Sequence, residues 1–227
     1  MSVAVVTGAG RGIGRAVALA LAGRGCDVAL LGRTTSDLDA AASAVAAAGR
    51  RGLPIACDVA RAAEVERAAA RVLAELGPPD VVVNNAGSVV RASLLETSEQ
   101  DWDQVVDANL KGAFLVTRAF LPSMRARGTG RFVAIGSISG TMGTARLTAY
   151  CASKWGVLGF TKALAEELRG TGLVTVCVMP GSVDTAMLEG SGFAPQMSPE
   201  DVANVVAYAA LDAPAAMNGS AVEVFGP

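Results

Sequence analysis

Residues 3–14 read Val3-Ala4-Val5-Val6-Thr7-Gly8-Ala9-Gly10-Arg11-Gly12-Ile13-Gly14, an apolar run that passes directly into glycines. A short apolar run ended by glycine predicts a buried strand over 2–7, and the periodicity beyond it predicts a helix over 12–24. Glycines between a strand and a helix permit a tight turn and let the backbone approach a phosphate closely. The free N–H groups and positive dipole end of the helix would then attract that anion.

The spacing of these glycines is G-x-x-x-G-x-G, formed by Gly8, Gly12 and Gly14. It differs from the G-x-G-x-x-G spacing of the best-known dinucleotide-binding turn. A purely structural strand–glycine–helix junction is the alternative. Three glycines placed in this way after the first strand favour binding of a dinucleotide.

The rest of the chain repeats the alternation of apolar strands and helical segments. Such repeats predict an α/β fold, a Rossmann-type doubly wound parallel sheet of about seven strands with helices on both faces. A single domain over residues 1–227 is expected, and the long helix near 98–127 should weaken at Lys111-Gly112. The other strands are expected at 27–31, 52–57, 80–83, 130–135, 173–178 and 221–225, and the other helices at 36–48 (Ser36 as N-cap), 61–76, 148–169 and 198–211.

The least patterned segment covers residues 181–197 and is rich in Gly, Ser and Pro. It follows the sixth expected strand, and ligands of open α/β sheets bind at the carboxyl ends of strands. Long irregular loops in compact domains are more often functional than not. The segment is therefore interpreted as a substrate-side lid, with an ordinary connection as the alternative.

The composition favours a folded domain and argues against nucleic-acid-binding, membrane-spanning and metal-binding proteins. Hydrophobic residues make up 52% and charged residues 18% of 227 residues, with a net charge of −2, so a folded domain with no nucleic-acid partner is expected. Without a signal-peptide pattern or a membrane-spanning run, a cytoplasmic protein is expected. The four cysteines are scattered and histidine is absent, which argues against disulfides and a metal site.

The choice of cofactor depends on the end of the second strand, Leu30-Leu31-Gly32-Arg33-Thr34. An NAD site usually has an acid there to bind the ribose 2′-hydroxyl, whereas an arginine accommodates a 2′-phosphate. No acid is present, and Arg33 and Arg11 offer guanidinium groups instead. The sequence therefore predicts NADP(H) rather than NAD(H), with two solvated arginines as the alternative.

Tyr150 and Lys154 stand four residues apart in an expected helix, so both side chains share one face. A nearby ammonium favours the phenolate and lowers the pKa of a tyrosine from its usual value near 10. The pair can serve as an acid–base couple, and without histidine the chain offers few others. A half-buried Tyr beside a solvated Lys is the alternative.

Taken in order, these motifs resemble the short-chain dehydrogenase/reductase (SDR) family, in its compact single-domain branch. Within it, the chain looks most like 3-oxoacyl-[acyl-carrier-protein] reductase-like members, through residues 136–143. The residues that carry the resemblance are Thr7, Gly8, Gly12, Gly14, Asp58, Asn84-Asn85-Ala86-Gly87, Asn109, Ser137, Tyr150, Lys154 and Pro180-Gly181.

The resemblance implies a role for each catalytic residue. Tyr150 would be the general acid or base, and Ser137, with Ser139 as its rival, would orient the substrate carbonyl. Lys154 would lower the Tyr150 pKa and hold the nicotinamide ribose, while Asn109 would keep a water in a proton relay. The expected cofactor contacts are Gly8, Arg11, Gly12, Ile13, Gly14, Arg33, Asp58, Val59, Asn85, Ala86, Gly87, Tyr150, Lys154, Pro180, Gly181, Val183 and Thr185.

The expected activity is NADP(H)-dependent hydride transfer between a nicotinamide and a ketone or secondary alcohol, with a 3-oxoacyl thioester as the leading substrate. Alternatives are an NAD-preferring sugar, polyol or steroid dehydrogenase and a catalytically silent dinucleotide sensor. The resemblance also implies a homodimer or homotetramer. An acyl carrier protein is a candidate partner, for which four arginines would form a basic patch near the cleft, unless they are solvated helix ends: Arg125, Arg127, Arg131 and Arg169.

Overall fold

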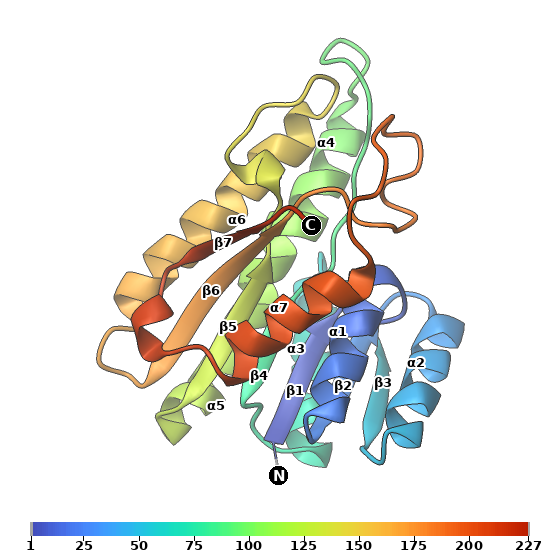
Figure 1. The fold of residues 1–227 in the computed structure, drawn as a ribbon. Helices are drawn as coiled ribbons and strands as arrows, with labels where there is room; N and C mark the ends of the chain where they lie inside the picture. The colour runs from blue at the N-terminus through green and yellow to red at the C-terminus, as the bar shows by residue number, and fades with distance from the viewer. Residues whose placement is uncertain (1, 227) are drawn as a thin grey trace.

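The computed structural model describes residues 2–226, and the predicted domain limits at Met1 and Pro227 lie outside them. Seven parallel strands form one sheet in the order β3-β2-β1-β4-β5-β6-β7 (Figure 1). The predicted α/β doubly wound sheet is confirmed. The strands are β1 (Ser2–Thr7), β2 (Cys26–Gly32), β3 (Gly52–Ala56), β4 (Val81–Asn84), β5 (Gly130–Ile135), β6 (Leu173–Pro180) and β7 (Ala221–Val224).

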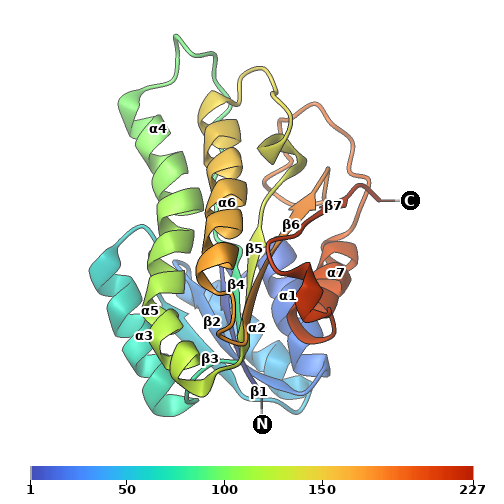
Figure 2. The same ribbon diagram turned by 90° about the vertical axis from the view of Figure 1, so that its left-hand side faces the viewer.

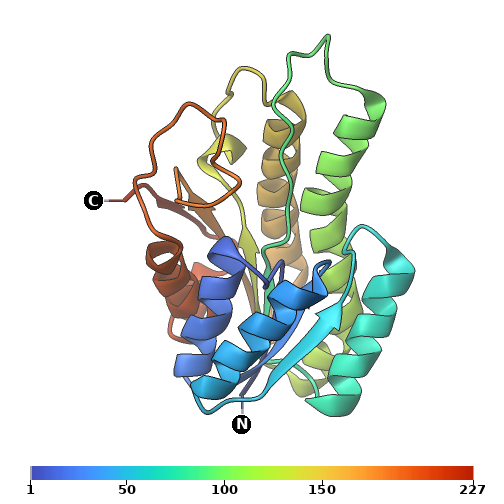
Figure 3. The same ribbon diagram turned by 90° about the vertical axis from the view of Figure 1, so that its right-hand side faces the viewer.

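Helices cover both faces of the sheet (Figures 2 and 3). One core cluster packs α1 (Gly12–Gly23), α2 (Thr35–Ala47) and α7 (Pro199–Leu211) on the sheet. A second cluster lies under α3 (Ala62–Glu75), α5 (Gly112–Arg127) and α6 (Thr148–Glu167). The central strands are buried on both faces, which explains why they read as continuous apolar runs rather than as alternating patterns.

Two helix predictions need correction in detail. Helix α2 begins at Thr35 after Thr34, and no side chain caps it, so the predicted Ser36 cap is wrong. The long predicted helix is divided into α4 (Glu99–Val106), a π-helical turn (Asp107–Lys111) and α5, which agrees with the expected weakness. Such π turns often mark functional positions in helices.

The strand order reverses between β1 and β4. In open α/β sheets, ligands bind in the crevice outside the carboxyl ends of the strands at this switch point. The glycine turn follows β1 and the segment after Asn84 follows β4, so both border the crevice. The loops 85–98, 141–147 and 181–197 rise at the same end of the molecule (Figure 1).

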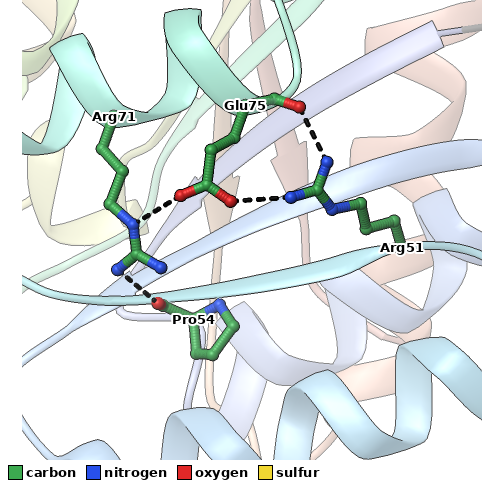
Figure 4. A network of polar contacts seen from close by, with 4 residues as sticks. All are labelled: Arg51, Pro54, Arg71 and Glu75. Carbon is green, nitrogen blue, oxygen red and sulfur yellow. Dashed lines mark hydrogen bonds and ion pairs between the residues drawn. The ribbon is translucent and has the colours of Figure 1, made fainter.

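The opposite, amino end of the sheet carries a network of ion pairs (Figure 4). Glu75, the last residue of α3, accepts from Arg71 at 2.7 Å and from Arg51 at 2.6 Å. Arg71 also donates to the Pro54 carbonyl in β3 at 3.3 Å. The network ties α3 to the edge of the sheet and is structural.

The predicted basic patch near the cleft is wrong, because its arginines lie at this amino end. Arg127 binds Asp80 and the Pro78 carbonyl just before β4. Arg131, at the start of β5, donates to carbonyls at the end of α7 and just after it. Arg169 pairs with Glu166 at the end of α6, and Arg125 lies in the last turn of α5. The parallel sheet separates these residues from the crevice by the length of its strands.

Within residues 2–226, no helix is long and apolar enough to cross a membrane. The same residues contain no group of three or more acidic or cysteine side chains able to hold a metal ion.

Candidate active site

Gly8, Gly12 and Gly14 of the glycine turn each occupy a position that disfavours any larger residue. Gly8 and Gly12 have positive φ values of 64° and 52°, which L side chains rarely adopt. A Cβ on Gly14 would lie 2.2 Å from the Gly8 carbonyl oxygen and 2.4 Å from Nδ2 of Asn85. The start of α1 at Gly14 therefore packs directly against the Gly8 backbone and against Asn85, which follows β4.

Thr7 and Asn85 hold the turn against β4. The Thr7 hydroxyl accepts from the backbone N–H groups of Asn85 and Ala86, both at 2.9 Å. Nδ2 of Asn85 donates to the carbonyls of Thr7 at 2.8 Å and Gly8 at 3.3 Å. Asn85 thus lies at the crevice, as predicted for a cofactor contact, and also fixes the shape of the turn.

The start of α1 suits a bound pyrophosphate. Its first turn contains no acidic residue, and no side chain caps its free N–H groups. Ile13 packs partly into the core beside it, and Thr185 of the 181–197 loop approaches Gly12, whose added Cβ would lie 3.2 Å away. The donors of α1 are therefore available to an anion, and these residues fit the dinucleotide that the sequence predicts.

The residues expected at the adenosine side lie around the same crevice. Arg11 and Arg33 are exposed, at the start of α1 and just after β2, and both are free to meet a phosphate. Asp58 is half-buried after β3, where its carboxylate accepts from the Ala60 N–H at 3.0 Å. Val59 is buried against Gly112 at the start of α5.

Ser137 and Tyr150 meet beyond the end of β5. Ser137 is 8% exposed, and its hydroxyl accepts from the Ser139 N–H at 3.1 Å. Burial raises the pKa of Tyr150 above its usual value, while a hydrogen bond with the Ser137 side chain and the positive charge of Arg91 oppose the rise. The sequence predicted a lowered pKa; the structure shows a raised one because loss of solvent outweighs the opposing contacts.

Lys154 is buried beneath Tyr150, with its Nζ 5.6 Å from the centre of the phenol ring. Its ammonium donates to the Ile135 carbonyl at 2.7 Å, at the carboxyl end of β5. Burial lowers the pKa of Lys154 from 10.5 to about 8. The two side chains share a helix face, as predicted, and both lie at the crevice end of the sheet.

The lowered Lys154 pKa predicts a stability that depends on pH. Between pH 8 and 10.5 the unfolded chain keeps a proton that the folded chain has lost, so stability rises with pH across this window, by at most about 3 kcal/mol. Lys154→Met should lack this rise. Chemical denaturation of both proteins at pH 7, 8, 9 and 10 checks this, and parallel stability curves would contradict it.

Asn109 connects the segment after β4 to α6. It lies in the π turn and is 3% exposed. Its Oδ1 accepts from the Ser88 N–H at 2.7 Å, and its Nδ2 donates to the Ser88 carbonyl and to Ser153 Oγ. An added Cβ on Gly87 would lie 2.9 Å from Oδ1. Asn109 therefore positions both walls of the crevice, and its predicted water relay stays a prediction.

The 181–197 loop has no helix and is anchored at both ends. Gly181 donates to the Val224 carbonyl of β7 at 2.8 Å, directly after the buried Pro180. Val183 is buried and forms an isolated bridge with Met197. Of the predicted contacts, Pro180 therefore ends β6, and Gly181, Val183 and Thr185 follow it along the crevice.

Arg91 was missed by the sequence reasoning. It is half-buried in the 85–98 loop, and its Nη2 donates to the Met187 carbonyl of the 181–197 loop at 2.6 Å. The available signal was a lone charge in the otherwise uncharged run from Ala86 to Leu95. The sequence does not show that the 85–98 loop lies beside the 181–197 loop, so the contact of Arg91 with Met187 could not be predicted.

Comparisons with known proteins agree with this geometry. A family model described as short chain dehydrogenase matches residues 2–194. The 3-oxoacyl-[acyl-carrier-protein] reductase of Synechocystis sp. is 38% identical over 94% of the chain and 91% of the relative, and that of Escherichia coli K12 is 35% identical over 99% and 96%. The crystal structure of a short-chain type dehydrogenase/reductase from Mycobacterium marinum superposes with a TM-score of 0.94, at 31% identity over 99% of this chain and 94% of that one. The glycine turn, the Ser137–Tyr150–Lys154 cluster and these likenesses together show that the chain belongs to the short-chain dehydrogenase/reductase family of oxidoreductases.

Proposed function

We propose that the protein is an NADP(H)-dependent reductase of ketones, or dehydrogenase of secondary alcohols. The observation that carries the proposal is the cluster of Ser137, Tyr150 and Lys154 at the same end of the sheet as the glycine turn. An acid–base side chain beside a dinucleotide crevice serves hydride transfer, in which a proton must move with the hydride.

The described side chains support carbonyl reduction in particular. A bound nicotinamide supplies the hydride, and the protein supplies orientation and the proton. Because its pKa is raised, Tyr150 keeps its proton at neutral pH and can donate it to the carbonyl oxygen. Ser137, whose side chain acts on the pKa of Tyr150, is placed to hold the same oxygen. Alcohol oxidation needs the phenolate, which the cation of Lys154 would favour.

Preference for NADP(H) rests on Arg33 and on the missing acid at the end of β2. Arg33→Asp removes a charged partner for the 2′-phosphate, worth about 1.5–3 kcal/mol, and adds repulsion. We expect the ratio of kcat/KM for NADPH to that for NADH to fall by roughly 10- to 100-fold. Steady-state kinetics with both cofactors measure it, and an unchanged ratio contradicts the assignment.

A 3-oxoacyl thioester is the first substrate to test, because the curated relatives named above reduce 3-oxoacyl groups on a carrier protein according to their names. A screen of ketones and alcohols that follows NADPH and NADH separately distinguishes this from an NAD-preferring sugar, polyol or steroid dehydrogenase. Binding of a dinucleotide without turnover of any substrate would instead indicate a sensor.

We also expect a homodimer or homotetramer in the cytoplasm. Three large apolar side chains are exposed on neighbouring helices: Trp102 (39%) on α4, Phe114 (41%) on α5 and Trp155 (53%) on α6. Their association would remove apolar surface from water. Light scattering that gives the mass of a single 22.8 kDa chain would contradict this expectation.

A further inference from the structure

Asn109 joins three segments of the crevice wall through one side chain. Its amide binds both backbone groups of Ser88, in the loop after β4, and its Nδ2 donates to Ser153 Oγ at 2.9 Å. Asn109 itself lies in the π turn between α4 and α5, and Ser153 lies in α6. The helix that carries Tyr150 is thereby tied to the loop that follows β4.

The Ser153 hydroxyl completes this connection within the helical turn that carries Tyr150. Ser153 is 1% exposed, and its Oγ donates to the Tyr150 carbonyl at 2.7 Å while it accepts from Asn109. Serine is a poorer helix former than alanine, so a buried serine inside α6 indicates a task for its hydroxyl. One hydroxyl group therefore links the backbone of Tyr150 to Asn109.

Both protons and the oxygen of the Asn109 amide are paired. Oδ1 accepts from the Ser88 N–H at 2.7 Å, and the two Nδ2 protons go to the Ser88 carbonyl at 3.0 Å and to Ser153. Asn109 is 3% exposed, so removal of the Ser153 hydroxyl would leave one buried N–H without this acceptor. A buried polar network that is fully paired holds its members in one arrangement, and an incomplete network does so less well.

The π turn and α6 also pack closely beside this hydrogen bond. Gly156 follows Ser153 by three residues and shares its helix face, and an added Cβ on Gly156 would lie 2.6 Å from Leu110 Cδ2. Leu110 directly follows Asn109 in the π turn. Because glycine has no side chain, the π turn lies close to α6 next to the bond between Asn109 and Ser153.

We propose that Ser153 is a positioning residue, which acts through Asn109 to hold the α6 turn of Tyr150 in place for proton transfer. The inference rests on the function proposed above. Tyr150 and Lys154 lie on either side of Ser153 in α6. A shift of this turn would move the pair relative to Ser137, which lies beyond the end of β5. Misplacement of reacting groups by about 1 Å lowers a rate by about 100-fold.

The test compares variants of Ser153 in the reduction of methyl 3-oxobutanoate with NADPH. We expect Ser153→Ala to lower kcat by roughly 10- to 100-fold and to leave KM for the ketone and the affinity for NADPH unchanged. Ser153→Cys, whose thiol is only a weak donor and acceptor, should have a kcat between those of Ser153→Ala and wild type. Titration with NADPH gives the fraction of folded enzyme in each preparation, by which kcat is corrected.

A double-mutant cycle tests whether Ser153 acts through Asn109. Asn109→Ala should lower kcat as well, and adding Ser153→Ala to it should cause no further loss, because the partner of the hydroxyl is already gone. Losses that multiply in the double variant would mean that the two residues act independently, and would overturn the inference.

Thr161→Val is the matched control and should keep the wild-type kcat. Thr161 also buries a hydroxyl in α6, at 1% exposure, and this hydroxyl donates to the Val157 carbonyl at 2.8 Å, about two turns further along the helix. An equal loss of kcat in Thr161→Val would show a general effect of losing a buried hydroxyl, and would overturn the inference.

Two further outcomes separate the inference from the proposed function. A wild-type kcat in Ser153→Ala, or in Ser153→Cys if the alanine variant does not fold, would overturn the inference and leave the proposed function intact. If wild type reduces neither methyl 3-oxobutanoate nor any other ketone with NADPH or NADH, the proposed function fails, and the inference fails with it.

Discussion

Tyr150→Phe is expected to lower kcat by roughly 10²- to 10⁴-fold while the affinity for NADPH stays unchanged. The substitution removes the hydroxyl and keeps the half-buried ring, whose centre lies 5.6 Å from Lys154 Nζ. Without that proton donor, the oxygen of the reduced carbonyl must take a proton from water. Steady-state turnover and fluorescence titration with NADPH separate the two effects.

Tyr208→Phe is the matched control, since Tyr208 is the other tyrosine of the chain and lies exposed on α7. It should keep wild-type turnover. Full activity of Tyr150→Phe would mean that another group delivers the proton. A parallel loss of NADPH affinity would mean that the Tyr150 hydroxyl also holds the cofactor, so that the fall in kcat does not report proton transfer alone.

Gly14→Ala is expected to weaken NADPH binding by roughly 100-fold, the equivalent of two lost hydrogen bonds to a charged group at about 1.5 kcal/mol each. The added Cβ would overlap the Gly8 carbonyl at 2.2 Å and Asn85 Nδ2 at 2.4 Å. Neither can move freely, because the first is backbone and the second is held on Thr7. The turn must open, which displaces the donors that would face the pyrophosphate, and overpacking of this kind also costs about 1–3 kcal/mol of stability.

Gly23→Ala provides the comparison within the same helix. Gly23 is the last residue of α1, is exposed and has nothing within 4 Å of an added Cβ. Alanine there should leave NADPH affinity unchanged and stability equal or slightly higher, since glycine is the poorer helix former. Calorimetric titration and thermal denaturation of both variants provide the measurements. Tight NADPH binding by Gly14→Ala would refute the assigned role of the turn.

The sequence predicted the strands well because each is an apolar run ended by Gly, Pro or a polar residue. Expected strands at 2–7 and 130–135 coincide with β1 and β5, and Ser198-Pro199 opens α7 with a capping box as its residue types suggest. The prediction of Ser36 as the N-cap was wrong, because local propensity does not show which residue ends the extended segment after β2. Element boundaries depend on packing that the local pattern does not contain.

Sequence by itself determined the doubly wound fold and the residues that lie at its switch point. Hydrophobic periodicity marks strands that alternate with helices, and strands joined through helices run parallel, with their carboxyl ends at one edge of the sheet. The tertiary structure alone decided how these residues behave. Burial in the folded protein raises the pKa of Tyr150, and the Lys154 ammonium donates to the Ile135 carbonyl. The arginines of the predicted basic patch lie at the amino end of the sheet, and Arg91 donates to the Met187 carbonyl. Each of these depends on burial or on contact between segments distant in the chain, and neither quantity is encoded in the spacing of residues.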